Sequence, residues 1–91
     1  MKLAWSADAE ADRIAIFQFI AVDNPAAAFD MEELFEASAA QLCDFPEMGR
    51  PGNVPNTREL TVHRNYRIVY KLISDVVFIA NIIHARRAWP E

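Results

Sequence analysis

The hydrophobic period of this sequence changes once along the chain, and that change constrains the fold more than any other feature. Before Pro46, apolar residues recur every three or four positions, which is the period of an amphipathic helix. From Arg58 onward the period is two, in runs rich in β-branched and aromatic residues that are typical of strands. The chain therefore divides into a helical first half and a β-rich second half.

The first half predicts a short strand and two helices. Lys2–Trp5 is the strand candidate, and Ser6 can cap the helix that follows it. Asp23-Asn24-Pro25 interrupts the helical pattern, because the residue before a proline avoids the α conformation whereas proline suits the first turn of a new helix. A second helix then runs to Phe45-Pro46, and the two helices should form an antiparallel hairpin.

The second half predicts a three-stranded antiparallel meander. Its strands are Glu59–His63, Tyr66–Ile73 and Val76–Ile83, and two-residue turns at Arg64-Asn65 and Ser74-Asp75 join them. The stretch before the first of these strands is rich in proline, glycine and asparagine and is predicted to be a loop. The expected fold is therefore α+β in the order β-α-α-β-β-β, with a helix hairpin covering one face of an antiparallel sheet.

Two-residue turns also predict the strand register. They place Arg58 opposite Lys71, Arg67 opposite Val62 and Ile82, and Lys71 opposite Phe78. In this register Arg58, Arg67 and Lys71 share one face of the sheet, and His84 lies on that face near Arg67. The other face is apolar and should be the one that the helices cover; it carries Ile68, Tyr70, Leu72, Val77, Ile79 and Ile83.

Arg67, His84 and Arg87 could converge on the basic face. Two guanidiniums and an imidazole can bind a phosphodiester or the carboxylates of a partner, with a bidentate geometry that lysine lacks. Strand-end residues that simply extend into water would give the same pattern, so both interpretations stand. The two histidines and one cysteine of the chain do not form a spaced metal-ligand set, and no metal site or cofactor is predicted.

Length and charge narrow the class of protein further. Ninety-one residues fit one domain, residues 1–91. Residues 1–48 carry ten acidic and two basic side chains, whereas residues 49–91 carry seven basic and three acidic ones, so one face can attract an anionic partner. A single cysteine fits a reducing cytoplasm. The sequence lacks a signal-peptide core and an apolar run of the roughly 20 residues that span a bilayer, and it predicts a soluble cytoplasmic protein without a membrane partner.

Several segments resemble the RelE/ParE family of toxins from bacterial type II toxin–antitoxin systems. The similarity spans nearly the whole chain. Its specific parts are the run Tyr66-Arg67-Ile68-Val69-Tyr70 and, in the closing segment, His84, Arg87, Trp89 and Pro90. The resemblance implies the same β-α-α-β-β-β fold and a cognate ParD-like or RelB-like antitoxin that binds the toxin in a hetero-oligomeric complex and neutralises it.

The family divides in function, and the resemblance implies two alternatives. RelE-like members cleave messenger RNA on the ribosome, with basic residues and a tyrosine or histidine near the C-terminus. ParE-like members inhibit DNA gyrase and lack a complete nuclease set. No tyrosine or histidine follows Arg87, so the ParE-like branch is favoured and the protein is not expected to be an enzyme. A nuclease would have to use Arg67, His84 and Arg87, and a non-toxic relic that only binds its antitoxin is a third alternative.

Two surfaces are predicted to carry this function. The target-binding or anion-binding surface comprises Arg58, Arg67, Lys71, His84, Arg87 and Trp89. The antitoxin-binding surface comprises Ile16, Phe19 and Ile20 on the first helix, together with Arg67. The three apolar residues exceed what one stripe facing a sheet requires, and an exposed apolar patch usually marks a binding site. An amphipathic antitoxin helix is expected there, with an extended acidic segment passing toward Arg67.

Overall fold

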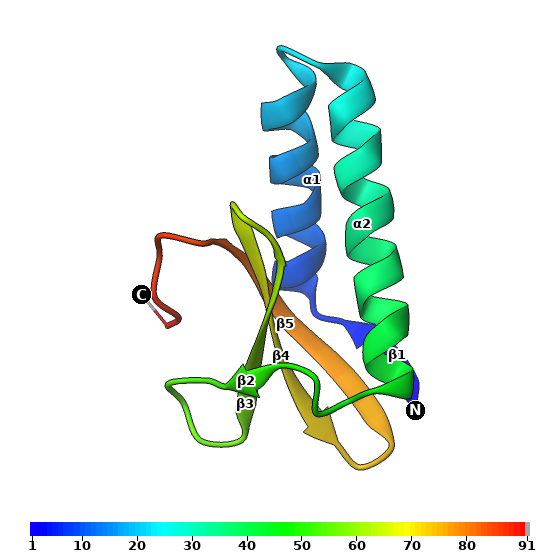
Figure 1. The fold of residues 1–91 in the computed structure, drawn as a ribbon, viewed down its shortest axis with the longest axis vertical. Helices are drawn as coiled ribbons and strands as arrows, with labels where there is room; N and C mark the ends of the chain where they lie inside the picture. The colour runs from blue at the N-terminus through cyan, green and yellow to red at the C-terminus, as the bar shows by residue number, and fades with distance from the viewer. Residues whose placement is uncertain (91) are drawn as a thin grey trace.

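A computed structural model describes residues 1–90 and shows two helices packed on a five-stranded sheet (Figure 1). The elements follow in the order β1 (Lys2–Trp5), α1 (Ala7–Ala21), α2 (Pro25–Asp44), β2 (Arg50–Pro51), β3 (Thr57–His63), β4 (Tyr66–Ile73) and β5 (Val76–His84). This order confirms the predicted α+β fold. The one addition is β2, a two-residue strand inside the predicted loop.

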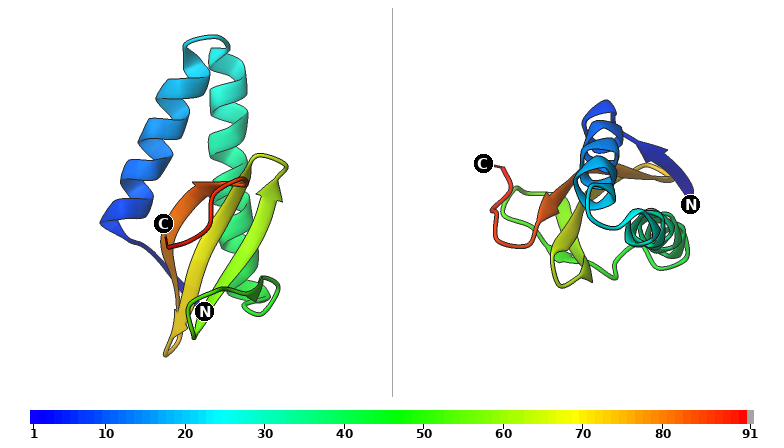
Figure 2. Two further views of the ribbon diagram at one scale, coloured as in Figure 1. Left: turned by 90° about the vertical axis from the view of Figure 1, so that its left-hand side faces the viewer. Right: turned by 90° about the horizontal axis from the view of Figure 1, so that it is seen from above.

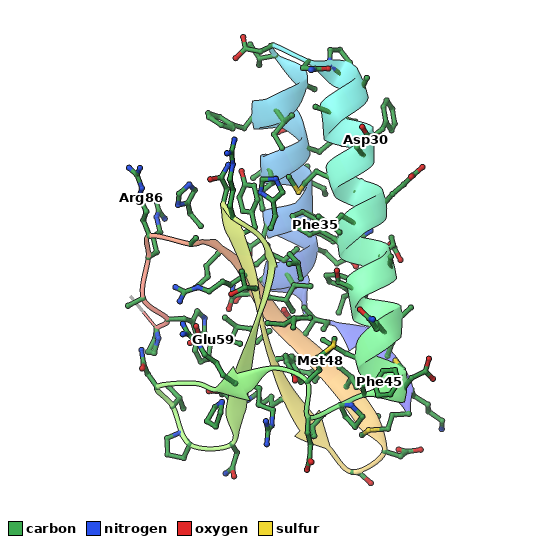
Figure 3. The ribbon with its side chains drawn as sticks, in the orientation of Figure 1. Asp30, Phe35, Phe45, Met48, Glu59 and Arg86 are labelled. Atoms are coloured by element: carbon green, nitrogen blue, oxygen red, sulfur yellow. The ribbon has the colours of Figure 1, made fainter. Side chains whose placement is uncertain are left out.

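The sheet has the strand order β1-β5-β4-β3-β2. Strand β1 runs parallel to β5, and the other neighbours are antiparallel. The helix hairpin covers one face, and the C-terminal tail crosses the opposite side, which we call the open face (Figure 2). Phe35 of α2 is buried between helix and sheet, where its ring meets Tyr66 edge to face at 5.9 Å (Figure 3). The end of the hairpin at which α1 connects to α2 projects beyond the strands (Figure 1).

Each helix begins at a residue whose side chain caps its N-terminus. The Ser6 hydroxyl accepts a hydrogen bond from the Ala9 amide at 2.9 Å, as its position predicts. Asn24 caps α2 by accepting from the Ala27 amide at 3.1 Å, and Pro25 occupies the first turn. None of the helices in residues 1–90 is long and apolar enough to cross a membrane.

The predicted register is correct next to the turns and wrong farther along the strands. His63 pairs with Tyr66, and Lys71 pairs with Phe78, as expected. A β-bulge between Thr61 and His63 then shifts β3 by one residue against β4, so that Arg58 lies opposite Tyr70 rather than Lys71. A second bulge, which leaves Ala80 of β5 unpaired, shifts the β4–β5 pairing in the same way.

Because of these register shifts, several residues lie on the opposite face of the sheet from the one predicted. Arg67 lies opposite Thr61 and Ile83 rather than Val62 and Ile82. Ile83 therefore belongs to the open face, where it packs with Val69, and Ile82 joins the core under the helices. Because directly paired residues share a face, Arg58 lies on the helix-covered face with Tyr70. It does not join Arg67 and Lys71.

Tyr70 and Arg58 hold the loop that leads into β2. The Tyr70 hydroxyl donates to the Pro46 carbonyl at 2.7 Å and accepts from the Gly49 amide at 2.9 Å. Arg58 donates to the Gly49 carbonyl at 2.7 Å. Burial raises the pKa of Tyr70 above its ordinary value of 10.0, and the Gly49 hydrogen bond only partly opposes the shift.

We expect Tyr70→Phe to lower the free energy of unfolding by about 2 kcal/mol at neutral pH, because two backbone groups lose a buried partner. The raised pKa gives a second signature. A tyrosine that binds its proton more tightly when folded contributes stability that is complete below the unfolded pKa and is lost as pH rises through the folded value. Urea unfolding should therefore show a steeper alkaline loss in the wild type than in Tyr70→Phe. Equal slopes above pH 10.0 would contradict this cause of the shift.

Candidate functional site

Four arginines gather around a cavity of about 530 Å³ on the open face of the sheet. We call it the arginine pocket; its charged and polar lining consists of Arg50, Asn53, Glu59, Arg67, Arg86 and Arg87. Strands β2, β3 and β4 supply the floor, and the C-terminal tail supplies the rim. Figure 3 shows Glu59 on the side of the sheet away from α2 and Arg86 extending outward from the tail. Three of the guanidinium groups, those of Arg50, Arg86 and Arg87, belong to exposed residues.

Glu59 and Arg67 form an ion pair beneath this rim. Glu59 is only 6% exposed, and its carboxylate lies 3.2 Å from a terminal nitrogen of Arg67. The same carboxylate oxygen is 4.0 Å from Arg50. The other terminal nitrogen of Arg67 donates to the Arg87 carbonyl. Arg67 therefore links the floor of the pocket to the tail, and its side chain is 13% exposed.

Trp89 fixes the tail across the open face. Its ring packs against the cluster of Val69, Ala80 and Ile83. The indole nitrogen donates to the Asn81 side-chain oxygen at 2.8 Å, and the Asn81 amide donates in turn to Asp12 of α1 at 3.0 Å. The tail that carries Arg86 and Arg87 is thus connected to the first helix through two side-chain hydrogen bonds.

The structure brings together only some of the predicted target-binding residues. Arg67 and Arg87 meet in the arginine pocket, and Trp89 anchors its rim. His84 was predicted to lie beside Arg67, but after the β5 bulge it pairs with Tyr66 on the helix-covered face, with ring centroids 5.8 Å apart. Lys71 is on the open face but lies over Phe78, outside the pocket lining.

Sequence reasoning missed Arg50, Asn53, Glu59 and Arg86 as pocket residues. Arg50 and Asn53 lie in a segment whose composition indicates only a loop, and its approach to β3 depends on the Tyr70 and Arg58 hydrogen bonds. Glu59 was missed because a register without the β3 bulge places it opposite Tyr70 on the apolar face. Beyond the bulge it lies opposite Val69, on the same face as Arg67.

A second cavity of about 530 Å³ lies between α1 and the end of the sheet. We call it the helix groove. Ile16 and Phe19 line one wall, and Tyr66, His84 and Trp89 line the other. Phe19 is 75% exposed. Ile20, which was predicted to join the same surface, instead packs against the core and lies outside the groove lining.

Comparison with known proteins assigns the chain to a family. The family described as "ParE toxin of type II toxin-antitoxin system, parDE" matches residues 3–89. The chain belongs to the ParE toxin family. It is a toxin of a type II toxin–antitoxin system, and the ParE-like branch of the predicted RelE/ParE resemblance is confirmed.

Individual relatives agree with the family. The putative toxin Y4kP of Sinorhizobium fredii is 31% identical over 91 residues, which cover 99% of this chain and 94% of the relative. Toxin RelE2 of Caulobacter vibrioides is 35% identical over 86 residues, which cover 94% and 97%. A solved structure of the chromosomal ParDE system from P. aeruginosa superposes with a TM-score of 0.83 at 26% identity, covering 92% of this chain and 95% of that one. The family match therefore covers the helix hairpin, the sheet and most of the C-terminal tail.

Proposed function

We propose that this ParE-family toxin acts by binding DNA gyrase rather than by cleaving messenger RNA, and that a cognate antitoxin neutralises it. The observation that supports binding is the position of His84. A nuclease of this fold would need an imidazole or phenol within hydrogen-bond reach of the reacting hydroxyl, next to the arginines that hold the phosphate. His84 lies on the helix-covered face and does not line the arginine pocket, and of the four arginines only Arg87 shares a cavity with it. His63 and Tyr66 lie on the same face as His84 and are also absent from the pocket lining.

The alternative is a ribosome-dependent messenger RNA endoribonuclease. The name of the RelE2 relative and the arginines around Glu59 favour it. Glu59 is the carboxylate nearest those arginines in the pocket lining, but its burial and its ion pair with Arg67 keep it from reaching a ribose hydroxyl. This geometry supports the gyrase proposal over the nuclease.

The decisive experiment uses the free toxin in two assays. In a supercoiling assay with purified gyrase, we expect inhibition and trapped gyrase–DNA complexes. In ribosome toeprinting, we expect the same pattern with and without toxin. Codon-specific cleavage together with normal supercoiling would overturn the proposal and establish the nuclease. Normal growth after induction without the antitoxin would instead indicate a relic that has lost its activity.

The helix groove is the proposed site for an antitoxin helix. Phe19 and Ile16 offer apolar contacts, and His84 and Arg87 line the same groove, so an amphipathic helix with an acidic end fits its chemistry. Arg87 also lines the arginine pocket, so an acidic segment leaving the groove would pass directly over the arginines. The proposed antitoxin would then cover both surfaces at once.

We expect Phe19→Asp to weaken antitoxin binding about a hundredfold, because a largely exposed aromatic side chain would be replaced by a charge in an apolar contact. The loss should persist at high salt, since it is not a screened charge pair. Ile14→Asp is the matched control, because Ile14 is 58% exposed on the same helix but outside the groove lining. Titration calorimetry on both variants tests this. Equal affinities of Phe19→Asp and the wild type in a folded protein would exclude the groove as the docking site.

A further inference from the structure

The arginine pocket contains its own anion. Glu59 is the least exposed charged residue of the pocket floor, and its carboxylate lies within 4.0 Å of both Arg50 and Arg67. Because opposite charges attract strongly where water is largely excluded, Glu59 competes with any external anion for the guanidinium of Arg67, whose side chain is 13% exposed. Its attraction for the exposed Arg50 is weaker, because water screens that pair. The pocket is less electropositive than its four arginines suggest.

Both terminal nitrogens of Arg67 already have partners within the protein. One terminal nitrogen is ion-paired with Glu59, and the other donates to the Arg87 carbonyl. Its Nε is buried and makes no hydrogen bond within residues 1–90. A phosphate that used Arg67 in the usual bidentate manner would first have to displace Glu59 or detach the tail.

We propose that Glu59 is a specificity-determining residue that keeps the arginine pocket from binding nucleic-acid phosphates. Its carboxylate neutralises Arg67 and attracts Arg50. The guanidinium groups that face outward from the rim are those of Arg86 and Arg87. A polynucleotide needs several cationic contacts to release its counterions and bind tightly, whereas an acidic side chain of a protein needs one. This inference rests on the proposed function, since it explains how a face rich in arginine is reserved for protein partners.

The test is the affinity of the free, full-length toxin for a short labelled single-stranded RNA, and for a single-stranded DNA of the same length, measured by fluorescence anisotropy at low and moderate salt. We expect Glu59→Gln to bind both about tenfold more tightly than the wild type, which corresponds to about 1.4 kcal/mol. The salt dependence should also steepen, because one more phosphate is neutralised. An unchanged affinity in the folded variant would overturn the proposal.

Two controls separate a local effect from a change in net charge. Glu33→Gln removes the same charge from an exposed site on α2, remote from the pocket, and should leave RNA affinity within about twofold of the wild type. The double variant Glu59→Gln/Arg67→Gln restores the net charge of the wild type and should also bind RNA as the wild type does. If Glu33→Gln tightens binding as much as Glu59→Gln, the effect is general electrostatics and the proposal fails.

The double variant also tests the proposal if Glu59→Gln alone does not fold. It leaves no buried charge unpaired on the pocket floor, and Arg67 contributes nothing to RNA binding if the proposal is correct. A tenfold loss of RNA affinity in this variant would show that Arg67 binds phosphate directly, which would overturn the proposal. Gyrase inhibition by the wild type is measured separately, so either idea can fail without the other.

Discussion

Replacing Arg67 by alanine is expected to lower the free energy of unfolding by about 3 kcal/mol, because it leaves the carboxylate of Glu59 buried without its nearest partner. The substitution also removes the hydrogen bond to the Arg87 carbonyl, so the tail loses one of its attachments. Arg67→Lys should recover only part of the loss, since one ammonium group cannot span both partners as the planar guanidinium does.

Chemical denaturation measures this effect directly. Arg64→Ala provides the control, because Arg64 is exposed in the turn between β3 and β4 and should change stability by less than about 0.5 kcal/mol. The added substitution Glu59→Gln should restore much of the stability of Arg67→Ala, because no buried charge then remains unpaired. If Arg67→Ala is as stable as Arg64→Ala, the ion pair has no structural role.

Adding one methyl group at Gly49 is expected to have an effect of similar size. A Cβ at this position would lie 2.7 Å from both the hydroxyl oxygen and a ring carbon of Tyr70, and 3.0 Å from the Glu59 carbonyl. Tyr70 is fully buried and its hydroxyl is hydrogen-bonded, so its ring cannot move aside. Gly49→Ala should therefore cost about 3 kcal/mol through overpacking.

The same substitution should displace β2 and with it Arg50, at the edge of the arginine pocket. Thermal unfolding followed by circular dichroism checks the stability, with Pro55→Ala, an exposed change in the same loop, as the control. If the double variant Gly49→Ala/Tyr70→Phe loses as much stability as the two single variants together, the clash with the tyrosine hydroxyl is a minor part of the cost. A melting temperature for Gly49→Ala equal to that of Pro55→Ala would show that the loop relaxes freely.

The sequence predicts the elements of this fold well because their signals are local. Ser6, Asn24 and Pro25 determine where the helices begin, and the two-residue turns determine the first pairs of each hairpin. These features need only a few neighbouring residues. The hydrophobic periodicity of each half also shows which face of each element is apolar, and this predicts that the hairpin covers one face of the sheet.

The candidate site was predicted only in part because it depends on a β-bulge that has no local signal. The bulge at Ala80 frees backbone groups of β5, and residues of the first half of the chain satisfy them. The Ser6 hydroxyl donates to the Ala80 carbonyl at 2.6 Å, and the Asp12 carboxylate accepts from the Ile82 amide at 2.9 Å. Sequence spacing in β5 cannot reveal partners so distant. One unpaired residue was enough to move His84 to the other face.

The parallel pairing of β1 with β5 has a consequence for how the toxin is synthesised. Lys2 pairs with Val76, and Trp5 pairs with Ile79, so the first strand has no neighbour in the sheet until the last one has been translated. The Ser6 and Asp12 contacts with β5 must wait as well. Contacts between residues so far apart in sequence form slowly, because the chain between them loses conformational entropy before the strand pairing compensates for that loss. Helix α1 packs against β5 as well as α2, so it emerges from the ribosome long before one of the two surfaces that it packs against. Its apolar residues that face the sheet, Ile16 among them, are accessible to another chain throughout that interval.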